Sequence, residues 1–466
     1  MSAGIVVAGT HSGSGKTTIA LALMAAFSRQ GLRVAPFKVG PDFIDPGHHR
    51  IITGRPSTNL DGWMLTRGTN RDLFAKHRSG CDVAVVEGVM GLYDGYDGKS
   101  EAGSTAQMAK WLNLPVVLVV DARSMARSAA ALVMGFERFD PQLRFAGVVF
   151  NRVGSPGHLD FLRDALAGAV AMPCLGGLMH DDRLAVPERH LGLTTAEDHP
   201  WTPAVVDRMV DWLQAGIDCR RLIGPLSIGA RRAAHCAAAP HPVSGGPRIG
   251  IARDRAFCFY YPDNLSLLSG LGAELVDFSP ITDRRLPENL DGLYLGGGYP
   301  ELSAGALAGN RGMREAVRLA SRSRMPIYAE CGGFMFLCRE LIDLDGAAHA
   351  MAGCFPFVVR MDRHLRSLGY REVTLTEPTI LGEAGARIRG HEFHYSALEG
   401  DPASAGVPTV FSVAARTGSP QQRTGYCTAR TVGSYLHLHF GSNPAAAGGF
   451  VDACRRYHRE RTHGSS

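Results

Sequence analysis

The sequence has few features of secreted, membrane or nucleic-acid-binding proteins. Its ten cysteines include no C-x-x-C pair, "MSAGIVVAGT" lacks the pattern of a secretory leader, and no apolar run approaches membrane-spanning length. Lys and Arg form no dense stripe with interleaved aromatics, and the net charge of +5 is modest for 466 residues. We therefore expect a soluble cytoplasmic protein with reduced thiols, which binds neither membranes nor nucleic acid.

The apolar content is sufficient for two or three domains, because hydrophobic residues make up 45% of the chain and charged residues 20%. In the first part, Val-rich runs alternate with helix-like stretches. These runs are "GIVVAG", "RVAPFKVG", "DVAVVEG", "PVVLVVD" and "FAGVVFN". Such runs are typical of parallel strands that are buried on both faces. The alternation predicts an α/β fold with a doubly wound parallel sheet and ligands beyond the carboxyl ends of its strands.

A change in composition divides the chain. The stretch "RRAAHCAAAPHPVSGGP" at 231–247 has no periodicity and is rich in Ala, Pro and Gly, so we interpret it as a linker. Strand signals restart directly after it, which indicates a second α/β domain. We predict a nucleotide-binding domain over 1–195, a helical appendage and linker over 196–247, the second domain over 248–450, and a frayed tail over 451–466.

The stretch "VAGTHSGSGKTT" is similar to a phosphate-binding loop of unusual length. The common pattern G-x-x-x-x-G-K-[ST] needs glycine at position 10, but this chain has Thr10, and Gly9 lies one residue earlier. A strand before the loop, small residues within it and a helix after it still provide a phosphate cradle. A flexible Gly/Ser turn is the alternative. The predicted ATP-binding residues are Gly13, Ser14, Gly15, Lys16, Thr17 and Thr18.

Two acidic clusters follow later strands. "KVGPDFIDPG" contains Asp42 and Asp45, and "VVEGVMGLYDG" contains Glu87 and Asp94. Carboxyl ends of parallel strands meet at one edge of a sheet, and Mg²⁺ prefers carboxylate and hydroxyl oxygens. We predict Asp42, Glu87 and Thr17 as metal ligands, whereas Asp94 lies among glycines and suits a substrate role better. Each carboxylate could instead cap a helix.

The second domain contains a candidate nucleophile. "MPIYAECGGFMFL" places Cys331 between an apolar strand and a helix, as in a nucleophile elbow, where the helix N-terminus lowers a thiol pKa. The glycine turn of "YLGGGYPE", with Gly297 and Gly298, is suited to bind an oxyanion. "GSYLHLHFG" offers His437 and His439 as bases. Alternatives are an inert buried thiol and, with the histidines of "RGHEFHYS", a zinc site that lacks the usual cysteine or H-E-x-x-H spacing.

In combination, these segments resemble the cobyrinate a,c-diamide synthase family, which amidates two acetate side chains of a corrin precursor. The resemblance covers nearly the whole chain and is carried by "GTHSGSGKTT", "FKVGPDFIDPGHH", "VEGVMGLYDG", "DDRLAVPERHLGL", "ARDRAFCFYYPDNL", "GGGYPE", "AECGGFMFL", "RGHEFHYS" and "GSYLHLHF". It implies a P-loop domain of the dethiobiotin-synthetase type and a class I glutamine amidotransferase domain. It also implies ATP and Mg²⁺, a corrin polycarboxylate (cobyrinate or hydrogenobyrinate) and glutamine as ligands, and it allows for a homodimer.

The resemblance also implies roles for particular residues. Cys331 matches the glutaminase nucleophile and His437 the histidine that activates it. Many class I amidotransferases have a glutamate two residues after that histidine. This chain has His439 there, so we expect a Cys-His dyad. Asn151 matches an adenine-contacting position, and Asp45 is assigned with Asp94 to the substrate.

Other functions remain open at this stage. Within the same chemistry, the ring could be nickel sirohydrochlorin, or the protein could be a cobyric acid synthase, although "FCFYYPDN" and "GHEFHYS" favour the a,c-diamide family. From another class, a ParA/MinD-like ATPase could carry a degenerate amidotransferase module. A glutaminase regulated by nucleotide is a third alternative.

Overall fold

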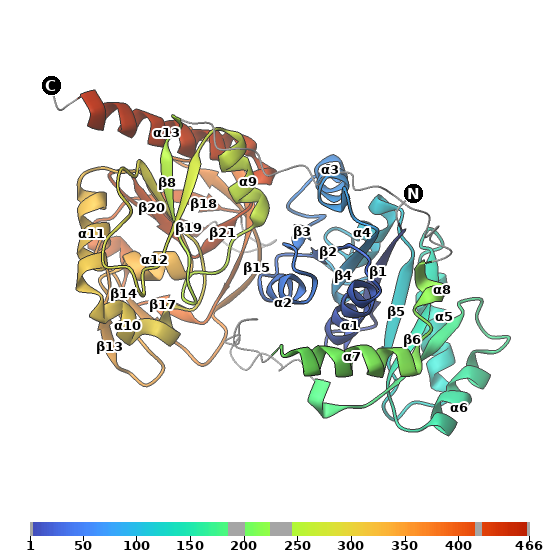
Figure 1. Cartoon of the computed structure of the whole chain (residues 1–466). Helices are drawn as coiled ribbons and strands as arrows, with labels where there is room; N and C mark the ends of the chain where they lie inside the picture. The colour runs from blue at the N-terminus through green and yellow to red at the C-terminus, as the bar shows by residue number, and fades with distance from the viewer. Residues whose placement is uncertain (1–2, 185–200, 224–244, 415–421, 464–466) are drawn as a thin grey trace. The chain divides into compact units, whose positions relative to one another are not determined.

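The computed structural model describes residues 3–184, 201–223, 245–414 and 422–463 (Figure 1). These residues form two compact units, one from the described residues before 224 and one from those after 244. The signature "PERHLGL" at 187–193 and most of the predicted linker lie outside the described residues. Within the described part, no helix is long and apolar enough to cross a membrane.

The first unit is built on a seven-stranded sheet in the order β3-β2-β4-β1-β5-β6-β7, and every pair of neighbours is parallel. The strands are β1 (Ala3–Gly9), β2 (Val34–Val39), β3 (Thr58–Leu60), β4 (Val83–Gly91), β5 (Val116–Asp121), β6 (Phe145–Val153) and β7 (Cys174–Met179). The predicted doubly wound sheet is confirmed. Its two outer strands, β3 and β7, were not predicted, because "TNL" is very short and "CLGGLM" is interrupted by glycines.

Helices cover both faces of this sheet. On one face lie α1 (Lys16–Arg29), α2 (Ile44–Thr53), α7 (Pro203–Gly216) and α8 (Arg220–Ile223), and on the other α3 (Arg67–Arg78), α4 (Thr105–Leu112), α5 (Ser128–Phe139) and α6 (Pro156–Leu166). The predicted helical appendage is α7 and α8. Met209, Val210 and Leu213 of α7 enter the core beside α1, so α7 is a layer of this unit. With both faces covered, the carboxyl edge of the sheet is the place for ligands.

The second unit contains a ten-stranded mixed sheet in the order β21-β16-β15-β18-β19-β20-β11-β10-β8-β9. Its strands are β8 (Arg248–Ala252), β9 (Glu274–Phe278), β10 (Gly292–Leu295), β11 (Ile327–Glu330), β15 (Ser367–Leu375), β16 (Arg387–His394), β18 (Thr409–Val413), β19 (Gln422–Thr428), β20 (Thr431–Ser434) and β21 (Leu436–Leu438). The stretch from β20 to β9 is parallel and the rest is antiparallel. A small sheet consists of β12 (Glu340–Ile342), β13 (Ala348–Ala350), β14 (Val358–Met361) and β17 (Ser396–Leu398).

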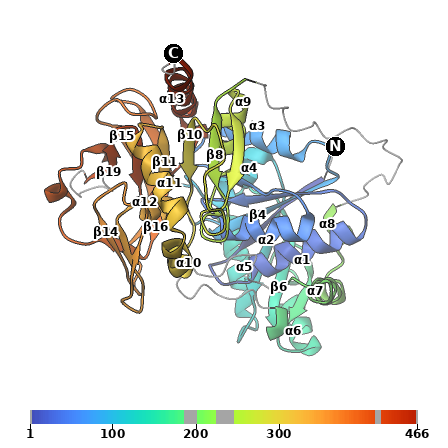
Figure 2. The same cartoon turned by 60° about the vertical axis from the view of Figure 1, so that its left-hand side comes forward.

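Helices again cover both faces of the large sheet. α9 (Pro262–Gly270) and α13 (Pro444–His463) pack side by side on one face (Figure 2), while α10 (Ala304–Gly309), α11 (Arg311–Arg322) and α12 (Gly332–Leu337) cover the other. The prediction of a frayed tail from residue 451 is wrong, because α13 continues to His463. Val451 and Cys454 are buried in the core, which anchors the helix past that point.

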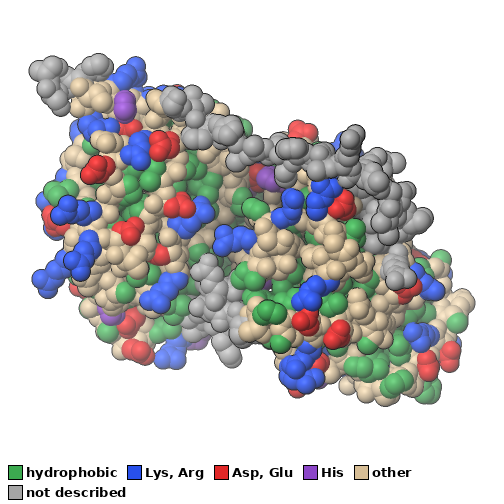
Figure 3. Space-filling view, viewed as in Figure 1, with side chains coloured by type: hydrophobic (Ala, Val, Ile, Leu, Met, Phe, Trp, Pro, Cys, Tyr) green, Lys and Arg blue, Asp and Glu red, His purple; other side chains and the backbone are tan. Residues whose placement is uncertain are grey.

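Neither the distribution of surface charge nor the cysteine thiols indicate a function by themselves. On the face shown in Figure 3, cationic and anionic side chains are interspersed, without an extended area of one sign. Among the nine cysteines of the described residues, no disulfide is formed. Function therefore has to be sought in the two strand–turn–helix junctions that the sequence singles out.

Candidate functional site

The phosphate-loop sequence forms a strand–loop–helix junction. β1 ends at Gly9, and α1 begins at Lys16 with Gly15 as its N-cap. Gly13 and Gly15 have φ values of +80° and +91°, which side-chain-bearing residues rarely adopt. Ser14 is buried inside the loop, and a Cβ added to Gly9 would overlap its hydroxyl. The longer loop is therefore a folded variant, with Thr17 and Thr18 half-buried in the first turn of α1.

Asn151 and Arg152, at the end of β6, brace this loop from the side. The Asn151 amide donates to the Ser14 carbonyl at 3.0 Å and accepts from the Arg152 N–H at 2.9 Å. The Arg152 guanidinium donates to the Gly13 carbonyl at 2.8 Å. A Cβ at Gly15 would overlap the Asn151 amide. In the structure the Asn151 amide holds the loop backbone, and the adenine contact stays a prediction, because one amide N–H and one lone pair are enough for these two bonds.

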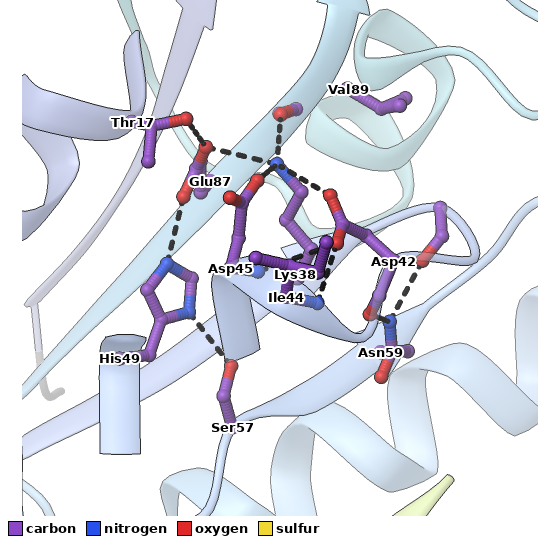
Figure 4. Close-up of polar contacts among 12 residues, drawn as sticks. Thr17, Lys38, Asp42, Ile44, Asp45, His49, Ser57, Asn59, Glu87 and Val89 are labelled. Atoms are coloured by element: carbon purple, nitrogen blue, oxygen red, sulfur yellow. Dashed lines mark hydrogen bonds and ion pairs between the residues drawn. The ribbon is translucent and has the colours of Figure 1, made fainter. Parts of the chain in front are cut away.

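The acidic residues come together around a lysine that our sequence analysis did not select. Lys38 is 2% exposed, and its Nζ lies 2.6 Å from Asp45 Oδ2, 2.9 Å from Glu87 Oε1 and 4.0 Å from Asp42 Oδ2 (Figure 4). Register explains the meeting, because Lys38 of β2 is paired directly with Glu87 of β4. A lysine in an apolar strand was the available signal, since a buried ammonium requires carboxylate partners.

Glu87 is the most connected member of this cluster. Its Oε1 accepts from the Thr17 hydroxyl at 2.5 Å, and its Oε2 lies 2.8 Å from His49 Nε2. The other nitrogen of His49 contacts the Ser57 hydroxyl at 2.9 Å. Burial alone would raise the pKa of Glu87, but Lys38 and then His49 and Thr17 outweigh it and hold this pKa well below its usual range. Glu87 is therefore a carboxylate anion at the foot of the phosphate loop.

Asp42 and Asp94 have local partners as well. Asp42 Oδ1 accepts from the Ile44 and Asp45 N–H groups at 2.8 and 3.3 Å, which is the helix-capping alternative, while its Oδ2 faces Lys38. Asp94 Oδ2 accepts from the Gly91 N–H at 2.8 Å and closes the turn after β4. The structure thus brings Asp42, Asp45 and Glu87 together around Lys38, whereas Asp94 lies in a separate turn.

Lys16 faces the same carboxylates. Burial and the charge of Lys38 lower the pKa of Lys16, and Glu87, Asp45 and Asp42 oppose that shift. Two ammonium groups and three carboxylates thus share the carboxyl edge of the sheet next to the loop. We call this arrangement of Lys16, Lys38, Asp42, Asp45 and Glu87 the charge network.

The oxygens of Thr17 and Glu87 fit a magnesium ion chemically. Mg²⁺ is commonly held by one or two protein oxygens together with water and phosphate oxygens. The two side chains meet at the first turn of α1, directly after the loop, and the second carboxylate oxygen of Asp42 is the one that faces Lys38. Across the described ranges, no group of three or more His, Cys, Asp or Glu side chains has metal-site geometry. Protein ligands alone would therefore not complete the coordination of the ion.

Replacing Lys38 tests the charge network. Lys38→Met is expected to lower the free energy of unfolding by about 3–5 kcal/mol, because it leaves Glu87 and Asp45 buried without their ammonium. Since the pKa of Glu87 lies below its ordinary value of 4.5, this stabilisation is present above that pH and is lost as the pH falls. Urea unfolding at pH 7 and at lower pH measures both effects.

Lys110 provides the matched control. It also contacts two carboxylates, Glu101 at 2.5 Å and Asp140 at 2.6 Å, but it lies nearer the surface. Lys110→Met is expected to cost about 1 kcal/mol or less. Equal losses of unfolding free energy in the two variants would contradict a special contribution of the buried network to stability.

The candidate nucleophile lies on a strained turn. Cys331, between β11 and α12, has φ +45° and ψ −106°, an unfavourable backbone conformation for a residue with a side chain. Its N–H donates to the Ser434 carbonyl at 2.8 Å. A Cβ added to Gly332 would lie 3.0 Å from both the N and the O of Gly298. The turn that carries Cys331 is therefore packed against the glycine turn that follows β10.

His437 contacts the same glycine turn from β21. It is 2% exposed, and a Cβ added to Gly297 would overlap its imidazole. Its ring stacks on that of His391, with centroids 4.8 Å apart. His391 is held in turn by the Tyr261 hydroxyl at 2.8 Å. The structure thus brings the turns of Cys331 and His437 together at Gly297 and Gly298.

The prediction that the Gly297 amide binds an oxyanion has to be corrected. Gly297 donates its N–H to the Phe259 carbonyl at 3.2 Å and accepts from the Phe259 N–H at 3.0 Å, so a bridge to the preceding segment uses this amide. No backbone acceptor for the Gly298 N–H is found among the described residues. Gly298, with φ +152°, lies beside Gly332 and stays the predicted oxyanion donor.

The protonation states differ from the expectation for a helix N-terminus. Burial, reinforced by the carboxylate of Glu301, raises the pKa of the Cys331 thiol instead of lowering it. Burial also lowers the pKa of His437 to about 3. Near neutral pH the resting pair is therefore a thiol and a neutral imidazole. A neutral imidazole is able to accept the thiol proton when a substrate binds.

His439 has a structural position. Its Nδ1 accepts from the Gly441 N–H at 3.1 Å, which caps the short turn after β21, and its ring packs on Tyr261 with centroids 4.5 Å apart. This arrangement agrees with the exclusion of His439 from the predicted catalytic pair.

Comparisons with known proteins cover both units. Residues 5–193 match the model of the CobQ/CobB/MinD/ParA nucleotide binding domain, and residues 248–445 match that of the CobB/CobQ-like glutamine amidotransferase domain. The chain is 46% identical to the cobyrinate a,c-diamide synthase of Syntrophotalea carbinolica, over 97% of this chain and 98% of that protein. Proteins of the same name from Dehalococcoides mccartyi and a Synechococcus species are 40% and 42% identical, again over 97% of this chain and 98% of each relative.

Proposed function

Because the chain belongs to the cobyrinate a,c-diamide synthase family, an ATP-dependent carbon–nitrogen ligase family with glutamine as amido donor, we propose that it amidates the a and c acetates of cobyrinate or hydrogenobyrinate. The observation that carries the proposal is the presence of two built centres in one chain. One is the charge network at the phosphate loop, and the other is the glycine turn at Gly297 and Gly298, against which both the turn of Cys331 and the imidazole of His437 pack. We place the reaction in the cytoplasm.

The first centre is proposed to activate the acid. A carboxylate is a poor acyl donor, because oxide is a poor leaving group, and transfer of the ATP γ-phosphoryl group gives an acyl phosphate that ammonia can displace. Lys16 would contact the phosphates and stabilise negative charge on the transferring group, and Lys38 would hold Glu87 and Asp45 beside the loop. Thr17 and Glu87 would hold Mg²⁺, which when bound offsets phosphate charge. The short distances from Lys38 to Asp45 and Glu87, with a further hydrogen bond to the Gly88 carbonyl at 3.0 Å, support a role in holding these carboxylates in place.

The second centre is proposed to release ammonia. Cys331 Sγ attacks the side-chain amide carbon of glutamine, its proton passes to His437, and the Gly298 N–H stabilises the oxyanion. The imidazolium then returns the proton to the departing nitrogen, which leaves as ammonia. Water hydrolyses the thioester to glutamate and restores the thiol. His437 is uncharged near neutral pH, so one of its ring nitrogens carries no proton and is able to accept one.

A product-mass experiment tests the function and its alternatives together. The chain is incubated with ATP, Mg²⁺, glutamine and, in separate reactions, cobyrinate, hydrogenobyrinate or nickel sirohydrochlorin. We expect a product in which two carboxyls of cobyrinate or hydrogenobyrinate have become amides, with two ATP consumed per ring. Amidation of nickel sirohydrochlorin alone would identify the nickel ring as the substrate. Amidation of a,c-diamide rings would indicate a cobyric acid synthase, and ATP or glutamine hydrolysis without any amide product would contradict the proposal.

A further inference from the structure

A buried carboxylate lies next to the imidazole of the second centre. Glu330 ends β11, directly precedes Cys331 in the chain and is 1% exposed. Its Oε2 lies 3.9 Å from His437 Nδ1. This distance is longer than a hydrogen bond but short for two opposite charges in a buried site. The positive charge of an imidazolium is shared by its two ring nitrogens, and Nδ1 is one of them. A charge on Glu330 therefore acts on the charged form of His437 directly.

Three donors hold Glu330 in this position. The Tyr328 hydroxyl and the Leu438 N–H donate to Oε1 at 2.6 and 3.0 Å, and the Tyr294 hydroxyl donates to Oε2 at 3.0 Å. The donors come from β10, β11 and β21, the strands that also carry the glycine turn, the nucleophile and His437. Hydrogen bonds from three rigid strands favour the charged carboxylate and fix its orientation.

We propose that Glu330 is the positioning residue of the glutaminase centre: its charge attracts the Nδ1 side of His437 and stabilises the imidazolium that forms when Cys331 loses its proton. The inference rests on the proposed roles of Cys331 and His437. A carboxylate in this role commonly accompanies a catalytic histidine. At the chain position two residues after His437 the protein has His439, which caps a turn instead. The structure provides a carboxylate from a different strand.

The pH dependence of glutamine hydrolysis distinguishes this role from a purely structural one. Burial raises the pKa of Glu330 to about 7, so its carboxylate becomes charged as the pH rises through that value. If the charged carboxylate stabilises the imidazolium of His437, kcat for glutamine hydrolysis rises over the same pH range. The titratable groups that face Glu330 or His437 are Tyr260, Tyr294, Tyr328, Cys331, His391, Glu392 and His394. The pKa of each of the three tyrosines is raised, so the tyrosines do not titrate near pH 7.

The test is Glu330→Gln in the full chain, with glutamine hydrolysis followed in the presence of ATP and the ring. Glutamine at this position keeps the size of the side chain but removes its charge. We expect kcat to fall about 10- to 100-fold with little change in KM for glutamine, and the limb near pH 7 to disappear. Amidation with added ammonia is expected to remain at the wild-type rate. Tyr294→Phe is the matched control, because it removes one hydrogen bond to the same carboxylate but keeps the carboxyl group, and above the limb near pH 7 it should change kcat only a few-fold.

Two results would overturn the inference. One is a Glu330→Gln variant with wild-type kcat and an unchanged pH profile. The other is a variant that loses thermal stability and ammonia-dependent amidation together, which would assign Glu330 a structural role only. Failure of the proposed function has a different signature, because a Cys331→Ser variant would then hydrolyse glutamine as fast as the wild type.

Discussion

Replacing Cys331 by serine is expected to reduce glutamine-dependent amidation by at least about 10⁴-fold and to leave amidation with high ammonia near the wild-type rate. The hydroxyl is a weaker nucleophile than the thiol, and no second thiol is on the elbow. The first centre does not use the residue, since ammonia replaces the product of the second. Product mass after incubation with glutamine or with ammonium chloride measures both rates.

The matched control is Cys427→Ser in the same unit. Cys427 lies on β19, away from the elbow, and its thiol contacts the Ala429 carbonyl. Its replacement should leave both nitrogen sources active. The division of labour between the centres is refuted by a well-folded Cys331→Ser variant that loses ammonia-dependent amidation as well, or by one that keeps using glutamine.

Lys16→Ala is expected to reduce amidation about 10³-fold or more with either nitrogen source. Lys16 is the loop lysine at the first position of α1, and it faces the carboxylates around Lys38. Without it, negative charge on the transferring phosphoryl group loses a stabilising ammonium, so no acyl phosphate is available to ammonia from any source. Glutamine hydrolysis measured without the ring should persist, because Cys331 and His437 belong to the other unit.

Lys110→Ala serves as the control for the loss of a lysine from the first unit. Its ammonium pairs with Glu101 and Asp140, and no contact joins it to the loop residues in the described part of the chain. ADP release and amide formation are followed together. Wild-type amidation by Lys16→Ala with ammonia would mean that the loop does not activate the acid.

Local sequence patterns were sufficient to predict the phosphate loop, the parallel sheet and the turn that carries Cys331. Glycine spacing before Lys16 predicted a phosphate loop despite its length, because the positive φ values at Gly13 and Gly15 are a local property of the backbone. Five apolar runs predicted the parallel sheet, since burial on both faces leaves a continuous apolar signature. The same holds for the elbow at Cys331, where a strand, two glycines and a helix follow each other in the chain.

Sequence alone determined which chemical groups the chain carries at its turns; the tertiary structure decided which groups meet. Lys38 faces Glu87 because the strand order places β2 beside β4 in register, and Glu330 faces His437 because β21 returns to the end of β11. Gly297 lost its predicted role to a bridge with Phe259, and the expected tail became the end of α13 through buried Val451 and Cys454. Each of these outcomes depends on contacts between residues distant in the chain, for which a local pattern contains no information.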